Sequence, residues 1–184
     1  MKYLSLTLLF LFFINTSCHR ADEDEDVLSQ EDISNIILSV TDDSGKTVDY
    51  DYSLNSIDNP IIRLENGKTY QVKAKFLNGN EDETESIIKA KNEHFLIYNF
   101  IDSEIKIERE SSNNPENDDV REDGNRVGLY TKWTVAKAEN GKSAELILTL
   151  IHAANSVSEA QNGTAWGSTI GGETDAEAVF GLSN

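Results

Sequence analysis

Apolar and polar side chains alternate with a period of two along much of this 184-residue sequence. Successive side chains of a β-strand point to opposite faces, so this alternation gives each strand one buried face and one wet face. The clearest alternating stretches are 48–54, 70–76, 129–135, 144–150 and 176–182, with shorter candidates at 36–40, 95–100 and 105–107. The pattern therefore predicts about eight short strands.

Turn-forming residues separate these strands. Gly follows Asn or Ser, which suit tight turns, in three segments: 42–45, 65–68 and 139–142. In the last two the pair is Asn-Gly, which is typical of a two-residue β-hairpin turn. Short strands at this spacing predict an all-β fold, an antiparallel immunoglobulin-like β-sandwich.

Three segments depart from the strand pattern. One short helical segment is expected within 81–93, where Ile87 and Ile88 suit one or two amphipathic turns. Segments 109–127 and 153–174 are polar and are expected to form long loops. Because binding residues usually lie on loops carried by a rigid scaffold, we expect a binding site in these two loops.

The N-terminus has the layout of a secretion signal. Lys2 precedes an apolar run at 4–14, which is shorter than the roughly 20 residues that span a membrane. Cys18, the single cysteine, cannot form an intramolecular disulfide, and its position suits acylation before signal peptidase II cuts ahead of it. We therefore predict a lipoprotein signal peptide at 1–17. The alternative is an ordinary secretory signal with an incidental cysteine, since Asn15 stands where most lipoproteins have Leu.

Five carboxylates follow the cysteine in one run. They are Asp22, Glu23, Asp24, Glu25 and Asp26. Like charges at this density repel one another, so 18–32 is expected to be a disordered, lipidated tether and 33–184 the folded domain. The run resembles the acidic export signal of Bacteroidetes lipoproteins. That resemblance implies an outer-membrane protein that faces the cell surface, with the periplasmic face as the alternative.

The formal net charge of −17 limits the choice of partners. A surface this acidic repels phosphate backbones, so nucleic acid is not expected as a partner. An acidic surface also disfavours binding to anionic lipids through a basic patch, so membrane contact is expected through the lipid anchor alone. The sequence contains no G-x-S-x-G elbow, H-E-x-x-H pair or phosphate loop. We therefore predict a protein that is not an enzyme and has no catalytic residues.

One candidate cation site lies in the acidic segment 118–125. Ca²⁺ takes six to eight oxygen ligands, and Asp119, Asp123 and Asn125 could supply several of them. Arg121, however, occupies a position where a ligand belongs. A solvated hairpin loop is therefore the favoured interpretation.

A second candidate is the pair His94 and His152. His94 begins an apolar strand and His152 continues the inward face of 146–150, so both are expected at strand ends. If the fold brings them together at one rim of the sandwich, two imidazoles and a carboxylate would suit Zn²⁺ or Cu²⁺. The alternative is that each histidine is a hydrogen-bonded packing residue. No other cofactor is predicted.

Several motifs together resemble a family of small uncharacterised Bacteroidetes lipoproteins. They are Glu93-His94-Phe95, the segment 123–129 followed by 131–134, the segment 148–152, and Gly171-Gly172-Glu173-Thr174-Asp175. Members are sometimes labelled type 1 periplasmic-binding fold proteins, a fold that requires repeated βαβ units and that this strand pattern argues against. The resemblance implies a lipoprotein that assists an outer-membrane uptake receptor.

The predicted function is therefore a surface-exposed, non-enzymatic lipoprotein that binds a ligand or partner as an accessory to a TonB-dependent uptake receptor. The alternative is a Zn²⁺- or Cu²⁺-binding envelope lipoprotein that uses His94 and His152.

Overall fold

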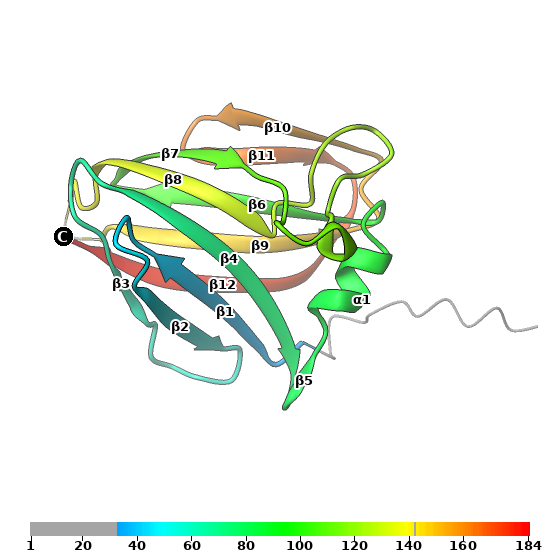
Figure 1. Ribbon diagram of the computed structural model, residues 1–184, viewed down its shortest axis with the longest axis horizontal. Helices are drawn as coiled ribbons and strands as arrows, with labels where there is room; N and C mark the ends of the chain where they lie inside the picture. Colours follow the sequence, from blue (N-terminus) through cyan, green and yellow to red (C-terminus); the bar gives the residue numbers. More distant parts are fainter. Residues whose placement is uncertain (1–32, 142) are drawn as a thin grey trace, which may run out of the picture.

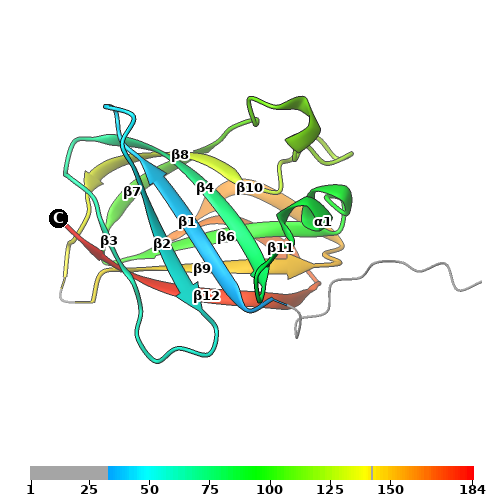
Figure 2. The same cartoon turned by 60° about the horizontal axis from the view of Figure 1, so that its bottom comes forward.

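Two β-sheets pack face to face in the computed structural model, which describes residues 33–141 and 143–184 (Figure 1). Neighbouring strands run antiparallel, except that β3 lies parallel to β12. The strands of one sheet cross obliquely over those of the other (Figure 2). The predictions for 1–17, Cys18 and 22–26 lie outside the described residues.

The first sheet has the strand order β2-β1-β4-β8-β7, with β5 beside β4. Its strands are β1 (Asn35–Thr41), β2 (Thr47–Ser53), β4 (Thr69–Asn78), β5 (Glu81–Asp82), β7 (Glu104–Arg109) and β8 (Tyr130–Lys137). The second sheet has the order β10-β11-β6-β9-β12-β3. Its strands are β3 (Ile61–Arg63), β6 (His94–Ile101), β9 (Glu145–His152), β10 (Ser156–Asn162), β11 (Ala165–Ile170) and β12 (Glu173–Ser183).

The predicted all-β class and the β-sandwich are confirmed. Each of the eight expected stretches overlaps a strand, and the described residues hold four more, namely β3, β5, β10 and β11. The predicted helical segment is α1 (Thr84–Lys89), which buries Ile87 and Ile88, and a short 3₁₀ turn, η1 (Pro115–Asn117), lies in the 109–127 segment. None of the helices in the described ranges is long and apolar enough to cross a bilayer.

The long loop predicted for 153–174 is wrong, because this segment contains the hairpin β10–β11. Strand β10 lies at the edge of its sheet and most of its side chains are exposed, so it has no apolar face for periodicity to reveal. Backbone hydrogen bonding to β11, rather than burial, is what defines this strand.

The two hairpins predicted from Asn-Gly pairs are also wrong. Asn66-Gly67 connects β3 to β4, and Asn140-Gly141 lies between β8 and β9, so both connections pass from one sheet to the other. The Asn66 side chain accepts a hydrogen bond from the Ala138 amide at 2.8 Å. The two connections therefore brace one another. The turn at 42–45 does join a hairpin, β1–β2.

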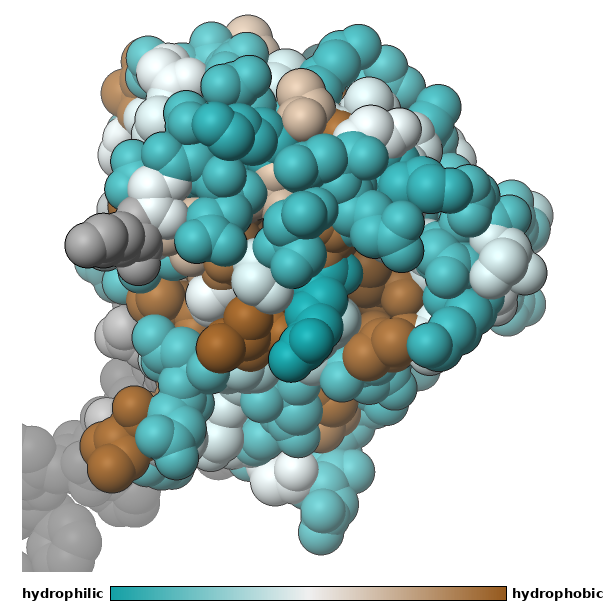
Figure 3. Space-filling view, turned by 90° about the vertical axis from the view of Figure 1, so that its left-hand side faces the viewer, coloured by the Kyte–Doolittle hydropathy of each residue, from teal (hydrophilic) through white to brown (hydrophobic). Residues whose placement is uncertain are grey.

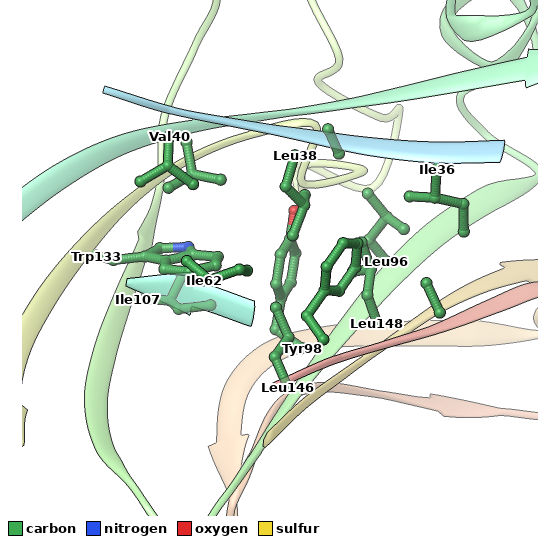
Figure 4. Packing of buried hydrophobic residues seen from close by; sticks show 14 of the residues in the cluster. Ile36, Leu38, Val40, Ile62, Leu96, Tyr98, Ile107, Trp133, Leu146 and Leu148 are labelled. Atoms are coloured by element: carbon green, nitrogen blue, oxygen red, sulfur yellow. The ribbon is translucent and has the colours of Figure 1, made fainter. Parts of the chain in front are cut away.

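The core is formed by the inward faces of both sheets around Trp133. Figure 4 shows this indole beside Ile62 and Ile107, with Tyr98 nearby. Tyr98 and Phe100 meet the Trp133 ring edge-on, at centroid distances of 6.2 and 5.2 Å. Such aromatic pairs add roughly 0.5–1.5 kcal/mol each to the stabilisation from burial. The indole Nε1–H is satisfied by the Thr131 hydroxyl at 2.9 Å.

Arg109, at the end of β7, crosses from the first sheet to the second. Its guanidinium donates to the carbonyl oxygens of Arg126, Val127 and Leu96 at 3.0, 2.6 and 2.5 Å. It also lies over the Phe95 ring, 4.2 Å from the centroid. A Cβ at Gly128 would overlap this guanidinium, and Gly128 has a φ of +99° that disfavours other residues. The glycine therefore makes room for the arginine.

We expect replacement of Trp133 by Ala to destabilise the fold by about 3–5 kcal/mol, because it leaves a cavity where both sheets meet. Urea unfolding followed by circular dichroism measures this change. Ile57, which is 98% exposed, provides the control, since Ile57→Ala should shift the free energy of unfolding by less than about 0.5 kcal/mol. Equal losses in the two variants would contradict this account of the core.

Candidate functional site: a histidine–carboxylate cluster

His94 and His152 are direct cross-strand partners in β6 and β9. Register-paired residues of an antiparallel sheet project from the same face, and here the two imidazole rings stack with centroids 5.1 Å apart and planes tilted by 15°. His94 lies at the start of its strand and His152 at the end of its own. The structure thus brings the two predicted histidines together at one rim of the sandwich.

A third residue, Asp175, faces both rings. Its Oδ2 lies 3.5 Å from His94 Nε2, and its Oδ1 lies 3.8 Å from His152 Nδ1. The alternation of 176–182 predicts that Asp175 points to solvent, and this prediction is wrong. The pairing of β12 with β9 shifts register between Thr174 and Ala176, so Asp175 is the extra residue of a β-bulge and is buried. Bulges are common beside functional sites because they re-aim a side chain.

Gly172 allows β12 to begin close to His152. Its φ is +90°, and a Cβ there would lie 2.8 Å from the His152 carbonyl oxygen and 2.7 Å from Ile151 Cγ2. Any larger residue would push the chain away from β9 just before the bulge. The Gly-Gly pair at 171–172 thus helps to place the Asp175 carboxylate.

The remaining ring nitrogens are held by oxygen acceptors. His94 Nδ1 lies 3.0 Å from the carbonyl oxygen of Ala90, the residue that follows α1, and His152 Nε2 lies 3.1 Å from Glu93 Oε2. A carbonyl oxygen can only accept, so His94 Nδ1 carries the hydrogen and a neutral ring presents its lone pair at Nε2. The cluster of Glu93, His94, His152 and Asp175 is called the rim cluster below.

Two polar atoms of the rim cluster are unsatisfied. His94 Nε2 and Asp175 Oδ2 are both buried, and neither has a hydrogen-bond partner among the described residues. A lone pair and a carboxylate oxygen at 3.5 Å repel each other unless a positive charge lies between them. Leaving such groups buried and unpaired costs about 1–3 kcal/mol, and more for a charged group. The geometry therefore calls for a positive charge at this position.

The acidic segment 118–125 supports the rim cluster from outside. The buried Arg121 side chain donates from one nitrogen to the carbonyl oxygens of Lys91 and His94, at 2.9 and 2.8 Å. Its Nε lies 3.2 Å from Asp123 Oδ2, which balances the charge. Arg121 thus ties this segment to the residues between α1 and β6.

The candidate calcium ligands do not point to one centre. Asp119 is buried, and its Oδ2 accepts from the amides of Gly128 and Leu129, each at 2.9 Å. Asp123 binds the Asn125 amide and Arg121 instead. With the side chains as they stand, no group of three or more His, Cys, Asp or Glu within 33–141 and 143–184 is arranged to hold a metal ion. In the rim cluster the two rings are stacked, so their lone pairs lie in nearly parallel planes.

Surface grooves lie elsewhere within 33–141 and 143–184. One of about 400 Å³ separates the edge strands β2 and β3 and includes the exposed Val48 and Ile61; Figure 3 faces this side and shows hydrophobic patches divided by hydrophilic residues. Another, of about 660 Å³, lies under 110–114, and a third of about 600 Å³ adjoins Trp166. Both segments that were expected to carry the site thus border a groove, while the rim cluster lies beside them at strand ends.

Comparisons of this chain with protein-family models, with curated proteins and with solved structures found no match. The resemblance to Bacteroidetes lipoproteins therefore remains a prediction from the motifs. Two of those motifs contain the rim residues that periodicity missed, Glu93 in Glu93-His94-Phe95 and Asp175 at the end of 171–175.

Burial raises the pKa of Asp119 above the ordinary 3.8, although its bonds to the Leu129 and Gly128 amides act in the opposite direction. The folded protein then binds this proton more tightly than the unfolded chain, so stability from this group falls as the pH rises through the raised pKa. We expect the wild type to gain free energy of unfolding relative to Asp119→Asn as the pH falls from neutral towards 3.8. Urea unfolding of both proteins across this range measures the difference.

Asp42→Asn is the matched control of opposite sign. Its hydrogen bonds, the largest effect being that of the Ser44 hydroxyl, lower the pKa of Asp42 below 3.8. The wild type should therefore lose stability relative to Asp42→Asn on acidification. Parallel pH profiles for the two variants would contradict both assignments.

Proposed function

We propose that this protein is a lipid-anchored, non-enzymatic binding module of the outer membrane, displayed at the cell surface, which binds its ligand at the rim cluster. The main support is that His94 Nε2 and Asp175 Oδ2 are buried together without hydrogen-bond partners among the described residues. The partly exposed His152 and Glu93 lie beside them. Folded proteins satisfy nearly all buried polar groups, so a facing pair of this kind is typical of a binding site.

The binding role is favoured over catalysis by what the histidines contact. Among the described residues, neither imidazole is hydrogen-bonded to a hydroxyl, the contact that would activate a serine or threonine nucleophile. Each ring instead has an oxygen acceptor beside one nitrogen, the Ala90 carbonyl for His94 and the Glu93 carboxylate for His152. Such contacts orient a ring so that its other nitrogen can bind a ligand.

The proposed cellular location rests on the sequence of the N-terminus. The apolar run, the single cysteine and the five carboxylates after it favour a lipid anchor and export to the outer face. Two or three acyl chains hold a protein on a membrane almost permanently, since each buried CH₂ contributes about 0.8 kcal/mol. Through the resemblance noted above, the proposed partner is a TonB-dependent uptake receptor in the same membrane.

A second candidate function is that of a Zn²⁺- or Cu²⁺-binding envelope lipoprotein. The specific observation that favours it is the direct pairing of His94 with His152, together with a carboxylate that faces both rings. Two imidazoles and a carboxylate are a common ligand set for these ions.

We expect Cys18→Ala to abolish labelling with an alkyne-tagged palmitate and to move the protein from the membrane to the soluble fraction. A second variant neutralises the acidic run by replacing Asp22, Asp24 and Asp26 with Asn and Glu23 and Glu25 with Gln. It should remain lipidated but become resistant to protease added to intact cells. Protease shaving followed by immunoblotting measures this, with lysed cells as the control for cleavability. A wild-type protein that is protected in intact cells would contradict display at the surface.

A further inference from the structure

We propose that the rim cluster is a site for one divalent transition-metal ion, with His94 Nε2, His152 Nδ1 and the Asp175 carboxylate as its ligands. This inference rests on the metal-binding candidate function and names the ligands and the movement that it requires. The probe ion is Zn²⁺.

The donor atoms already lie at the spacing of ligands that share an ion. Zn²⁺ lies about 2.0–2.2 Å from nitrogen and oxygen ligands, so two ligands of a tetrahedral site are separated by roughly 3.4 Å. The nitrogen–oxygen distances in the rim cluster are 3.5 Å from His94 to Asp175 and 3.8 Å from His152 to Asp175. Both are longer than an ordinary hydrogen bond and close to this separation.

The outer contacts match those of metal-binding histidines. Such a histidine almost always gives its second nitrogen to a carbonyl or carboxylate, which fixes the tautomer and the ring orientation. Here the Ala90 carbonyl lies next to His94 Nδ1 and the Glu93 carboxylate next to His152 Nε2. The nitrogens left free are therefore the two that face Asp175.

The charges of the rim cluster also suit a divalent cation. Two neutral imidazoles and two carboxylates carry a charge of about −2. The nearby guanidinium of Arg121 is balanced by Asp123 at 3.2 Å, so it does not cancel this charge. A divalent ion would neutralise the pair of carboxylates and would separate His94 Nε2 from Asp175 Oδ2, the two atoms that lack partners.

Binding requires one ring to turn. The lone pairs of the stacked imidazoles lie in two nearly parallel planes, so they do not meet at one point until the stack opens. The His94 side chain is only 2% exposed and held by Ala90, whereas the His152 side chain is 17% exposed and lies at the solvent-facing end of the cluster. His152 is thus the ligand that rotates, and His94 and Asp175 are the fixed ones.

The test is Zn²⁺ titration by isothermal calorimetry of the full-length chain, purified in detergent and treated with EDTA. We expect one ion per chain. Asp175→Asn and His152→Ala should weaken Zn²⁺ binding by more than the roughly 10- to 100-fold that loss of an outer contact costs, while Glu93→Gln should fall within that range. Glu177→Gln, which removes an exposed carboxylate from the same strand, β12, is the matched control and should bind like the wild type.

Nuclear magnetic resonance of the imidazole nitrogens gives a second, independent measurement. Zn²⁺ should shift His94 Nε2 and His152 Nδ1 and leave His94 Nδ1 protonated. Absence of Zn²⁺ binding by the wild type, or unchanged binding by Asp175→Asn in a folded protein, would overturn the inference. Loss of binding in the Glu177→Gln control would also overturn it, because that carboxylate lies outside the rim cluster. None of these results bears on acylation or surface display, which the protease and palmitate experiments decide separately.

Discussion

The position of the rim cluster depends on a buried cation that crosses the sandwich, Arg109. Its guanidinium fixes the Leu96 carbonyl on β6, two residues beyond His94, and the Val127 carbonyl on the chain that leads into β8. Asp119 then binds the amides of Gly128 and Leu129. These contacts hold 118–127 against the second sheet, where it can support β6.

The same chain of contacts reaches the histidine itself. With 118–127 held in place, Arg121 donates to the His94 carbonyl and to the residues after α1, from which the Ala90 carbonyl reaches the His94 ring. Burying a guanidinium without a hydrogen-bonded carboxylate is costly, and burial lowers the pKa of Arg109. Three carbonyl acceptors and the Phe95 ring offset that cost. A polar interaction, rather than apolar packing alone, thus holds β6 and the segment outside it in a single arrangement.

How much of the fold can be predicted from the sequence depends on which structural property each sequence pattern reflects. A period of two reports burial, so it locates strands such as β4 and β9 whose inward side chains form the core. It fails for β10, which has little to bury, and for Asn66-Gly67, whose turn chemistry is right but whose flanking strands belong to different sheets. Strand partners are set by contacts far apart in the chain, and local patterns contain no information about them.

The residues of the rim cluster also differ in whether the sequence predicts them. The two histidines could be predicted because each continues an apolar strand to its end, and strand ends meet at a rim. Asp175 could not, because its inward direction comes from a bulge that breaks the alternation from which direction is inferred. Glu93 precedes the first residue of β6 and belongs to no periodic stretch at all. Residues that depart from the regular pattern are therefore the ones that complete the site.

A metal ion shared by both histidines requires an arrangement of the two rings that differs from the stacked one. With the hydrogen on Nδ1, His94 presents its Nε2 lone pair to Asp175 Oδ2, and His152 Nδ1 faces Asp175 Oδ1. A divalent ion needs both histidines neutral and the stack opened. The stacked arrangement of His94 and His152 therefore differs from the one that a shared metal ion requires, and the change between them would involve His152, which is the ring nearer to solvent.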